Sequence, residues 1–135
     1  ELPTSMQNKL MSQQNNEHIT HSYIEAHPEW FFVYSDDCTR KAYKGQAAVA
    51  GICDNAAPVS TKFFNCTRNS AYYTDELLKE HHVPHLMDEI ARIKEKAGNR
   101  KIVLFPKIGC GGAELPTRAP KFYKILVEEL NKLIA

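Results

Sequence analysis

Half of the six glycines in this chain fall within one four-residue segment, Gly109-Cys110-Gly111-Gly112. The segment follows an apolar stretch that ends at Phe105 and precedes a helical stretch that begins near Thr117. Glycine lets backbone N–H groups approach an anion closely, and a helix N-terminus nearby favours negative charge. The four residues are therefore candidates for binding a phosphate or a ribose. A tight turn without a ligand has the same glycine pattern and stays open as the alternative.

A second polar segment contains Ser35, Asp36 and Asp37 and comes directly after an aromatic stretch. Its two carboxylates could accept hydrogen bonds from ribose hydroxyls, whereas an aspartate that only caps a turn is the plain alternative. The segment leads to Gly45 and Gln46, at the start of a run of small residues that predicts a closely packed helix. All five residues are candidates for ligand binding.

Lys62 follows a third apolar stretch and is the candidate for chemistry. A lysine at the end of a strand can hold a phosphate or, when desolvated, act as a nucleophile, although most lysines are simply solvated. Cys110 could also be a nucleophile, but no histidine is placed near it by the sequence. We expect Cys110 to be a small buried side chain.

Three histidines, His81, His82 and His85, resemble a metal-binding pattern because the first and last lie one helical turn apart. No cysteine or carboxylate stands at an established ligand spacing from them, and Pro84 would distort the turn. We therefore expect no metal and no other cofactor.

The candidate residues need a scaffold of alternating strands and helices. Residues 30–34, 57–61 and 101–105 are predicted to be strands, joined by loops at 35–44 and 63–73. Helices are predicted at 20–27, at 46–50, from an N-cap at Thr74 to Gly98 with a kink or restart at Pro84, and from about Thr117 onward with Pro120 in the first turn. This alternation predicts an α/β fold with a mainly parallel sheet flanked by helices. The carboxyl ends of parallel strands share one edge, where ligands bind, so the three polar segments should converge there.

The composition, with 43% apolar and 24% charged residues, predicts a single soluble domain over residues 17–135. Residues 1–16 are rich in Gln and Asn and predict a flexible arm. A formal net charge of +1 argues against strong non-specific nucleic-acid binding, and no apolar run suggests a membrane. Four cysteines without a CxxC pair indicate free thiols and a cytoplasmic location.

Residues 104–111 resemble the late glycine loop of macrodomains, the ADP-ribose-binding α/β modules. The similarity is greatest to the branch that removes ADP-ribose from acidic side chains of proteins. Ser35-Asp36-Asp37-Cys38, with the small-residue helix after it, is similar to that branch's Ser-x-Asp-Cys loop. Thr61-Lys62 is similar to its Thr-Lys pair. The matches keep the family's order over roughly residues 30–133 and imply a reduced three-layer macrodomain-like architecture.

The resemblance also implies roles for individual residues. The glycine segment would cradle the diphosphate, Asp36 and Asp37 would position the distal ribose, and Lys62 would attack or stabilise the anomeric carbon. Where the hydrolase branch has an aspartate after the glycine loop, this chain has Ala113 and then Glu114. Glu114 is therefore the candidate for orienting the lysine or handling the proton.

A further similarity connects the chain to small uncharacterised proteins of phages and bacteria. These share the Gly-Gln-Ala-Ala segment at residues 45–48 and the Ala-Glu-Leu-Pro-x-Arg-Ala-Pro segment at residues 113–120. If the chain is phage-encoded, its location would be the host cytoplasm. The similarity brings no established activity with it.

Three functions stay open from the sequence. The chain binds ADP-ribose or a related NAD-derived nucleotide and hydrolyses an ADP-ribosyl linkage on a protein or nucleic acid. Alternatively, it binds such a nucleotide without turnover, as a sensor or sponge. In the third case it is a structural or interaction protein without a small ligand. The sequence leaves the oligomeric state undetermined.

Overall fold

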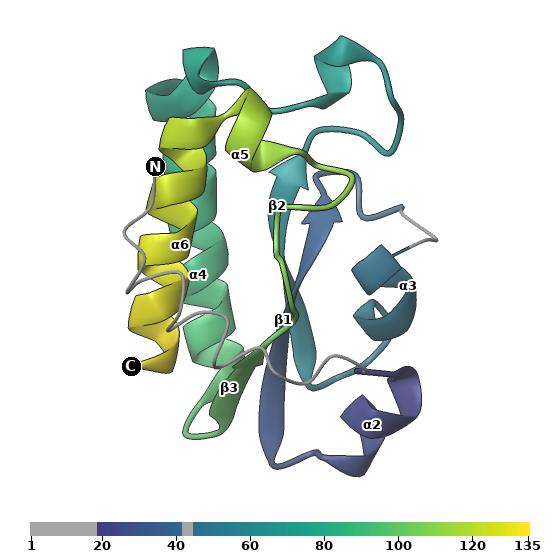
Figure 1. Ribbon diagram of the computed structural model, residues 1–135. Helices are drawn as coiled ribbons and strands as arrows, with labels where there is room; N and C mark the ends of the chain where they lie inside the picture. The colour runs from purple at the N-terminus through teal and green to yellow at the C-terminus, as the bar shows by residue number, and fades with distance from the viewer. Residues whose placement is uncertain (1–18, 42–44) are drawn as a thin grey trace.

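The computed structural model describes residues 19–41 and 45–135, and within them three strands form one parallel sheet (Figure 1). The strands are β1 (Trp30–Asp37), β2 (Ala56–Lys62) and β3 (Lys101–Leu104), in the order β2-β1-β3. β1 is central and mostly buried, with Phe31 and Phe32 fully enclosed, because helices cover both faces of the sheet.

Helices lie on both faces of the sheet and give the three-layer α/β fold that the sequence predicts. α4 (Val83–Ala97) and α6 (Pro120–Ile134) cover one face, and α2 (His21–Ala26) and α3 (Gly45–Ala50) lie on the other (Figure 1). The apolar stripes of α4 and α6 supply buried side chains to the core: Leu86, Ile90, Ile93, Ala97, Phe122, Leu126, Val127 and Leu130. The four-residue helix α5 (Leu115–Arg118) precedes α6.

The first strand is longer than predicted, since β1 continues through Ser35 and Asp36 to Asp37. The prediction of a loop from residue 35 was wrong. It rested on the polar side chains after Tyr34, which usually indicate an exposed segment. Here Asp36 and Asp37 are both buried while their backbones pair with β2. The register shifts between them, so Thr61 of β2 forms a bulge at the carboxyl edge.

The segment before α4 contains one helical turn that is tighter than an α-helix and one that is wider. A 3₁₀ turn, η2 (Asp75–Leu77), is followed by a π-helical turn, η3 (Leu78–His82), and α4 then begins with Pro84 in its first turn. The predicted restart at Pro84 is confirmed. Thr74 does stand at the N-cap position of η2, but the predicted side-chain cap is wrong because its hydroxyl makes no capping hydrogen bond.

The predicted final helix is two helices, α5 and α6. Ala119 has φ −143° and ψ 64°, which interrupts the helical path, and Pro120 starts α6. Proline is favourable in a first turn because its missing N–H would have no partner there. The predicted arm, residues 1–16, lies outside the described residues.

The described helices include none that is long and apolar enough to span a bilayer. All four cysteines are free thiols.

Candidate ligand-binding site

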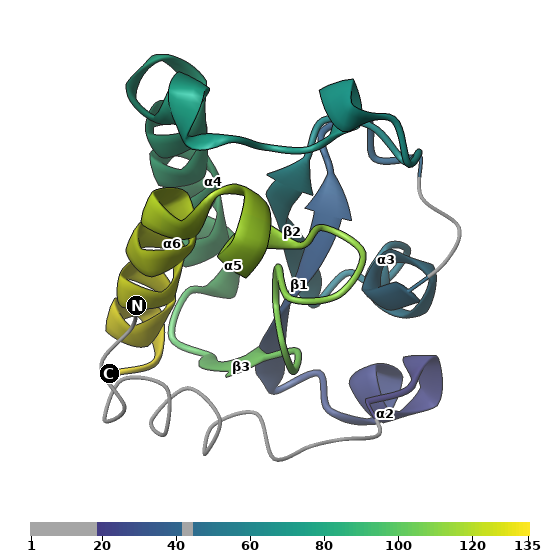
Figure 2. The same ribbon diagram turned by 45° about the horizontal axis from the view of Figure 1, so that its top comes forward.

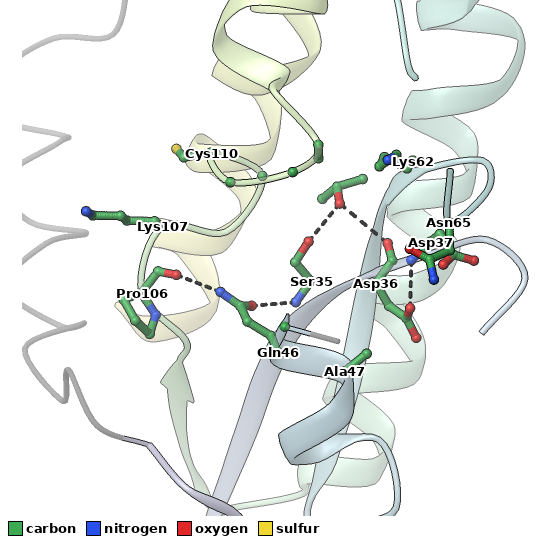
Figure 3. A pocket seen from close by; sticks show the side chains of 16 residues that line it. Ser35, Asp36, Asp37, Gln46, Ala47, Lys62, Asn65, Pro106, Lys107 and Cys110 are labelled. Carbon is green, nitrogen blue, oxygen red and sulfur yellow. Dashed lines mark hydrogen bonds between the residues drawn. The ribbon is translucent and has the colours of Figure 1, made fainter. Parts of the chain in front are cut away.

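A cavity of about 550 Å³ opens at the carboxyl ends of β1 and β2. The segment between β3 and α5 crosses these strand ends towards α3 and forms the opposite wall (Figures 2 and 3). Sixteen residues line the cavity: Ser35, Asp36, Asp37, Gly45, Gln46, Ala47, Thr61, Lys62, Asn65, Pro106, Lys107, Gly109, Cys110, Gly111, Gly112 and Ala113.

The three polar segments do meet at one edge of the sheet. Every site residue predicted from the sequence lines this cavity, with the exception of Glu114. The reason is topological, because three parallel strands present their carboxyl ends to the same side.

The end of β1 is tied to the β2 bulge by hydroxyl groups. Ser35 Oγ and Thr61 Oγ1 are 2.7 Å apart, and Thr61 Oγ1 donates to the carbonyl of Asp36 at 3.4 Å (Figure 3). With the Thr61 proton so engaged, Ser35 is the donor in the pair. The bulge therefore holds the cavity floor by side-chain bonds where the backbone ladder is irregular.

Asp36 is a buried carboxyl group on the cavity wall, 8% exposed. Its Oδ1 accepts a 2.7 Å hydrogen bond from the Asp37 N–H. Burial raises the pKa of Asp36 above its ordinary value, while that N–H and the Arg40 guanidinium act in the opposite direction. A buried carboxyl with one oxygen bonded by the backbone retains capacity to accept from a ligand hydroxyl.

Asp37 is turned into its own loop. Its Oδ1 accepts from the Thr39 N–H at 2.8 Å and also from the Thr39 hydroxyl. This is the turn-capping arrangement weighed for an aspartate at this place. Of the two carboxylates, Asp36 is thus the better placed for a ligand.

Gln46 joins the two walls of the cavity through its side-chain amide. Its Oε1 accepts from the Ser35 N–H at 2.8 Å, and its Nε2 donates to the Pro106 carbonyl at 2.7 Å (Figure 3). The sequence placed Gln46 at the site as a ligand contact. Its amide instead links the end of β1 to the start of the glycine loop.

The glycines of the loop have different structural requirements. Gly109 has φ +82°, and a Cβ there would lie 2.6 Å from Leu115 Cδ1. A Cβ at Gly111 or Gly112 would meet nothing within 4 Å. Gly109 therefore serves the turn itself, whereas Gly111 and Gly112 keep the cavity wall open.

The backbone N–H groups of this cavity-lining loop are only partly used within the protein. Within the loop, Cys110 N–H donates to the Lys107 carbonyl and Glu114 N–H to the Gly111 carbonyl. Among the described residues, the N–H groups of Gly111, Gly112 and Ala113 have no acceptor. Successive unpaired N–H groups on a concave surface favour an anion.

Lys62 lies at the cavity rim with its ammonium group already engaged. Its Nζ donates to the Cys66 carbonyl at 2.7 Å and lies 4.4 Å from the centroid of the Tyr72 ring. The backbones of Lys62 and Tyr72 form an isolated antiparallel bridge, which fixes the ring beside the lysine. An ammonium group has three donors, so Nζ can also donate to a ligand at the rim.

Glu114 stands outside the cavity. Its backbone is left-handed, with φ +53°, and its Oε1 accepts from Arg118 Nε at 3.1 Å. The Arg118 guanidinium also lies 3.6 Å from the centroid of the Tyr72 ring. Lys62 and Arg118 thus lie beside the same Tyr72 ring, and Glu114 is paired with Arg118.

Some participants were not predicted from the sequence. Asn65 lines the cavity, and Tyr72 and Arg118 stand beside Lys62. Asn65 and Tyr72 belong to the segment without a periodic pattern. The prediction that Cys110 is buried was wrong, because this thiol is exposed, with its Sγ 3.1 Å from the Tyr123 hydroxyl.

The three histidines form a ring cluster away from this cavity. His82 stacks on Tyr73 with centroids 3.8 Å apart, and His81 stacks on His85 at 5.1 Å. In the part of the chain that the structure describes, no group of three or more His, Cys, Asp or Glu side chains is arranged to hold a metal ion.

Residues 14–129 match the model of a family of unknown function (DUF7831). The chain belongs to this family. The DUF7831 match contains all the cavity-lining residues, so the site is part of the family's domain. No curated protein and no solved structure matches the chain.

Proposed function

We propose that the cavity binds ADP-ribose or a closely related NAD-derived nucleotide. The observation that carries the proposal is the row of unpaired N–H groups from Gly111 to Ala113 on the same cavity as the buried carboxyl of Asp36. The first is suited to a diphosphate and the second to a ribose hydroxyl. A nucleoside diphosphate sugar contains both groups.

The size of the cavity and the order of its segments support the same ligand. A volume of about 550 Å³ lies within the usual range for small-molecule pockets. The strand ends near Asp36 and Lys62 and the glycine loop are the three segments whose sequences resemble macrodomains. In this proposal Gly111 and Gly112 contact the diphosphate, and Asp36 contacts the distal ribose.

Hydrolysis of an ADP-ribosyl linkage would be performed by Lys62. Its amine would attack the anomeric carbon, the bond from that carbon to the modified group would break, and water would later displace the lysine. The modified group, on a protein or a nucleic acid, would leave with a proton.

Binding without turnover is the second candidate, as in a nucleotide sensor or sponge. It is favoured by the position of Glu114, whose carboxylate is paired with Arg118 outside the cavity. The carboxylate that was assigned to orient the lysine or handle the proton is therefore absent from the cavity.

Calorimetry with ADP-ribose, NAD and cyclic ADP-ribose tests the binding proposal. We expect ADP-ribose to bind and Gly111→Val to abolish binding, because the valine side chain would fill the open wall. Ala91→Val, at an exposed position of α4, is the matched control and should bind normally. Failure of all three nucleotides to bind the folded wild-type protein would refute the proposal.

Release of ADP-ribose from a modified protein and a modified oligonucleotide separates the two candidates. Turnover that is lost in Lys62→Ala, while ADP-ribose still binds, would establish hydrolysis through Lys62. Binding with no release in wild type would establish the non-catalytic function. Glu114→Gln tests the carboxylate, and unchanged turnover there would exclude it from the reaction.

A further inference from the structure

A cysteine, a histidine and a glutamate form a line at the junction of α2 and α3, away from the cavity-lining residues. Cys53 Sγ lies 3.4 Å from His21 Nδ1, and His21 Nε2 lies 3.2 Å from Glu25 Oε1. The His21 and Glu25 side chains are 41% and 64% exposed, and Cys53 is partly exposed. A small solute can therefore reach the group.

The hydrogen bonds around His21 define how a proton can move. In the neutral ring that donates from Nε2 to Glu25, Nδ1 carries a lone pair and accepts only from the Cys53 thiol. Once Nδ1 has taken that proton, it can donate to the thiolate or to the Val49 carbonyl, which is 3.3 Å away. Glu25 and Val49 thus both supply acceptors to the protonated ring.

We propose that Cys53 is a thiol-modification site that reacts with small disulfides, with His21 as general base and Glu25 as the residue that positions the ring. The thiol proton moves to His21 Nδ1 as the sulfur attacks one sulfur of the disulfide. A Cys53 mixed disulfide forms, the original S–S bond breaks, and the departing thiolate takes up the proton. The small disulfide is the only oxidant required.

The surroundings of Cys53 explain why a base is needed. Burial raises the pKa of the Cys53 thiol, and the carboxylates of Glu25 and Asp54 raise it further. The buried Tyr34 hydroxyl, whose pKa is itself raised to about 12, adds no positive charge. The thiol is therefore protonated near neutral pH, and its reaction depends on transfer of the proton to His21.

The other three thiols lack this arrangement. Cys38 and Cys110 have their sulfurs beside the hydroxyls of Tyr73 and Tyr123, at 3.3 and 3.1 Å. Cys66 is exposed. Within the described ranges, Cys53 is the only thiol with an imidazole nitrogen in hydrogen-bond range, so the other thiols serve as internal references.

The test follows mixed-disulfide formation at each cysteine by mass spectrometry, with oxidised glutathione in excess over the full chain. We expect His21→Gln to slow the reaction at Cys53 by about tenfold or more, given the size of general-base effects, and to leave Cys66 unchanged. Glu25→Gln should slow Cys53 less. Local unfolding in either variant would expose the thiol and accelerate the reaction, so it cannot imitate the expected result.

The pH profile distinguishes a base from a merely structural histidine. In wild type the rate at Cys53 should rise less steeply with pH than in His21→Gln, because the neighbouring imidazole takes the thiol proton. In His21→Gln it should keep rising with the thiolate fraction. Equal Cys53 rates in wild type and His21→Gln, or parallel pH profiles, would overturn the proposal.

Discussion

Gln46 Nε2 donates a 2.7 Å hydrogen bond to the carbonyl of Pro106, and this bond joins the first turn of α3 to the start of the glycine loop. The same amide accepts from the Ser35 N–H. The side chain of Gln46 therefore holds the two walls of the cavity at a fixed distance. Ligand affinity and stability should both respond when its amide is changed.

Gln46→Leu removes both hydrogen bonds and leaves a half-buried N–H without a partner. We expect the free energy of unfolding to fall by about 1–3 kcal/mol. Gln46→Glu is the matched comparison, because a carboxylate still accepts from Ser35 but cannot donate to Pro106. Denaturant titration should show a smaller loss of unfolding free energy for Gln46→Glu than for Gln46→Leu. Equal stabilities for wild type and Gln46→Leu would contradict the role assigned to the amide.

Substitution by alanine should affect stability at Gly109 but not at Gly111. Gly109→Ala places a Cβ against Leu115 at positive φ, so it should destabilise the fold by about 1–3 kcal/mol. Gly111→Ala meets open space and should leave the melting temperature nearly unchanged. Thermal melts of both variants check this. A larger loss in Gly111→Ala than in Gly109→Ala would show that the loop has a different conformation.

Glu89 is a buried carboxylate on α4 that contacts both β2 and the loop after β1. It is 3% exposed and accepts from the Ser60 N–H at 2.9 Å, from the Ser60 hydroxyl at 2.6 Å and from Arg40. Arg40 also donates to the Asp37 carbonyl at 2.7 Å, which ties the end of β1 to α4. Its side chain is 35% exposed, so solvent weakens the ion pair.

Glu89→Leu should lower the free energy of unfolding by about 2–4 kcal/mol, because it leaves the buried Ser60 N–H without an acceptor and Arg40 without its carboxylate. Glu95→Leu, at an exposed position on the same helix, is the control and should change stability little. Urea titration measures both. If the two variants are equally stable, the Ser60 and Arg40 contacts contribute nothing to the fold.

The buried His82 should make the free energy of unfolding decrease in acid. The side chain is buried, stacks on Tyr73 and donates from Nε2 to the Thr74 carbonyl. Burial is the main cause that lowers its pKa from 6.5, and burial likewise lowers the pKa of His81. Since the unfolded chain binds these protons more readily, stability is complete above about pH 6.5 and is lost as the pH falls below it.

For a single histidine such as His82, the slope in that window has an upper limit of about 1.4 kcal/mol per pH unit. His82→Phe keeps the ring stack and removes the titrating group, so its slope should be smaller than that of wild type. Denaturant titrations at several pH values between about 5 and 7.5 measure the difference. Identical slopes in the two proteins would exclude His82 as the source.

The sequence by itself determined the three-layer α/β fold and the edge of the sheet at which the site lies. Strand and helix patterns alternate along the chain, and parallel strands bring the residues that follow them to one side. Asp36, Lys62 and Gly111 could therefore be placed together without knowledge of any contact. Pro84 likewise marked the start of α4, because proline fixes its own backbone.

Only the tertiary structure decided which way the side chains point and which partners they choose. Glu114 is one residue from the cavity wall, yet its left-handed backbone and Arg118 hold its carboxylate outside. Gln46 bonds to residues far from it in the sequence, and Cys53 meets His21 across 32 positions. Such contacts depend on backbone dihedrals and on packing between distant segments, and a local sequence pattern specifies neither.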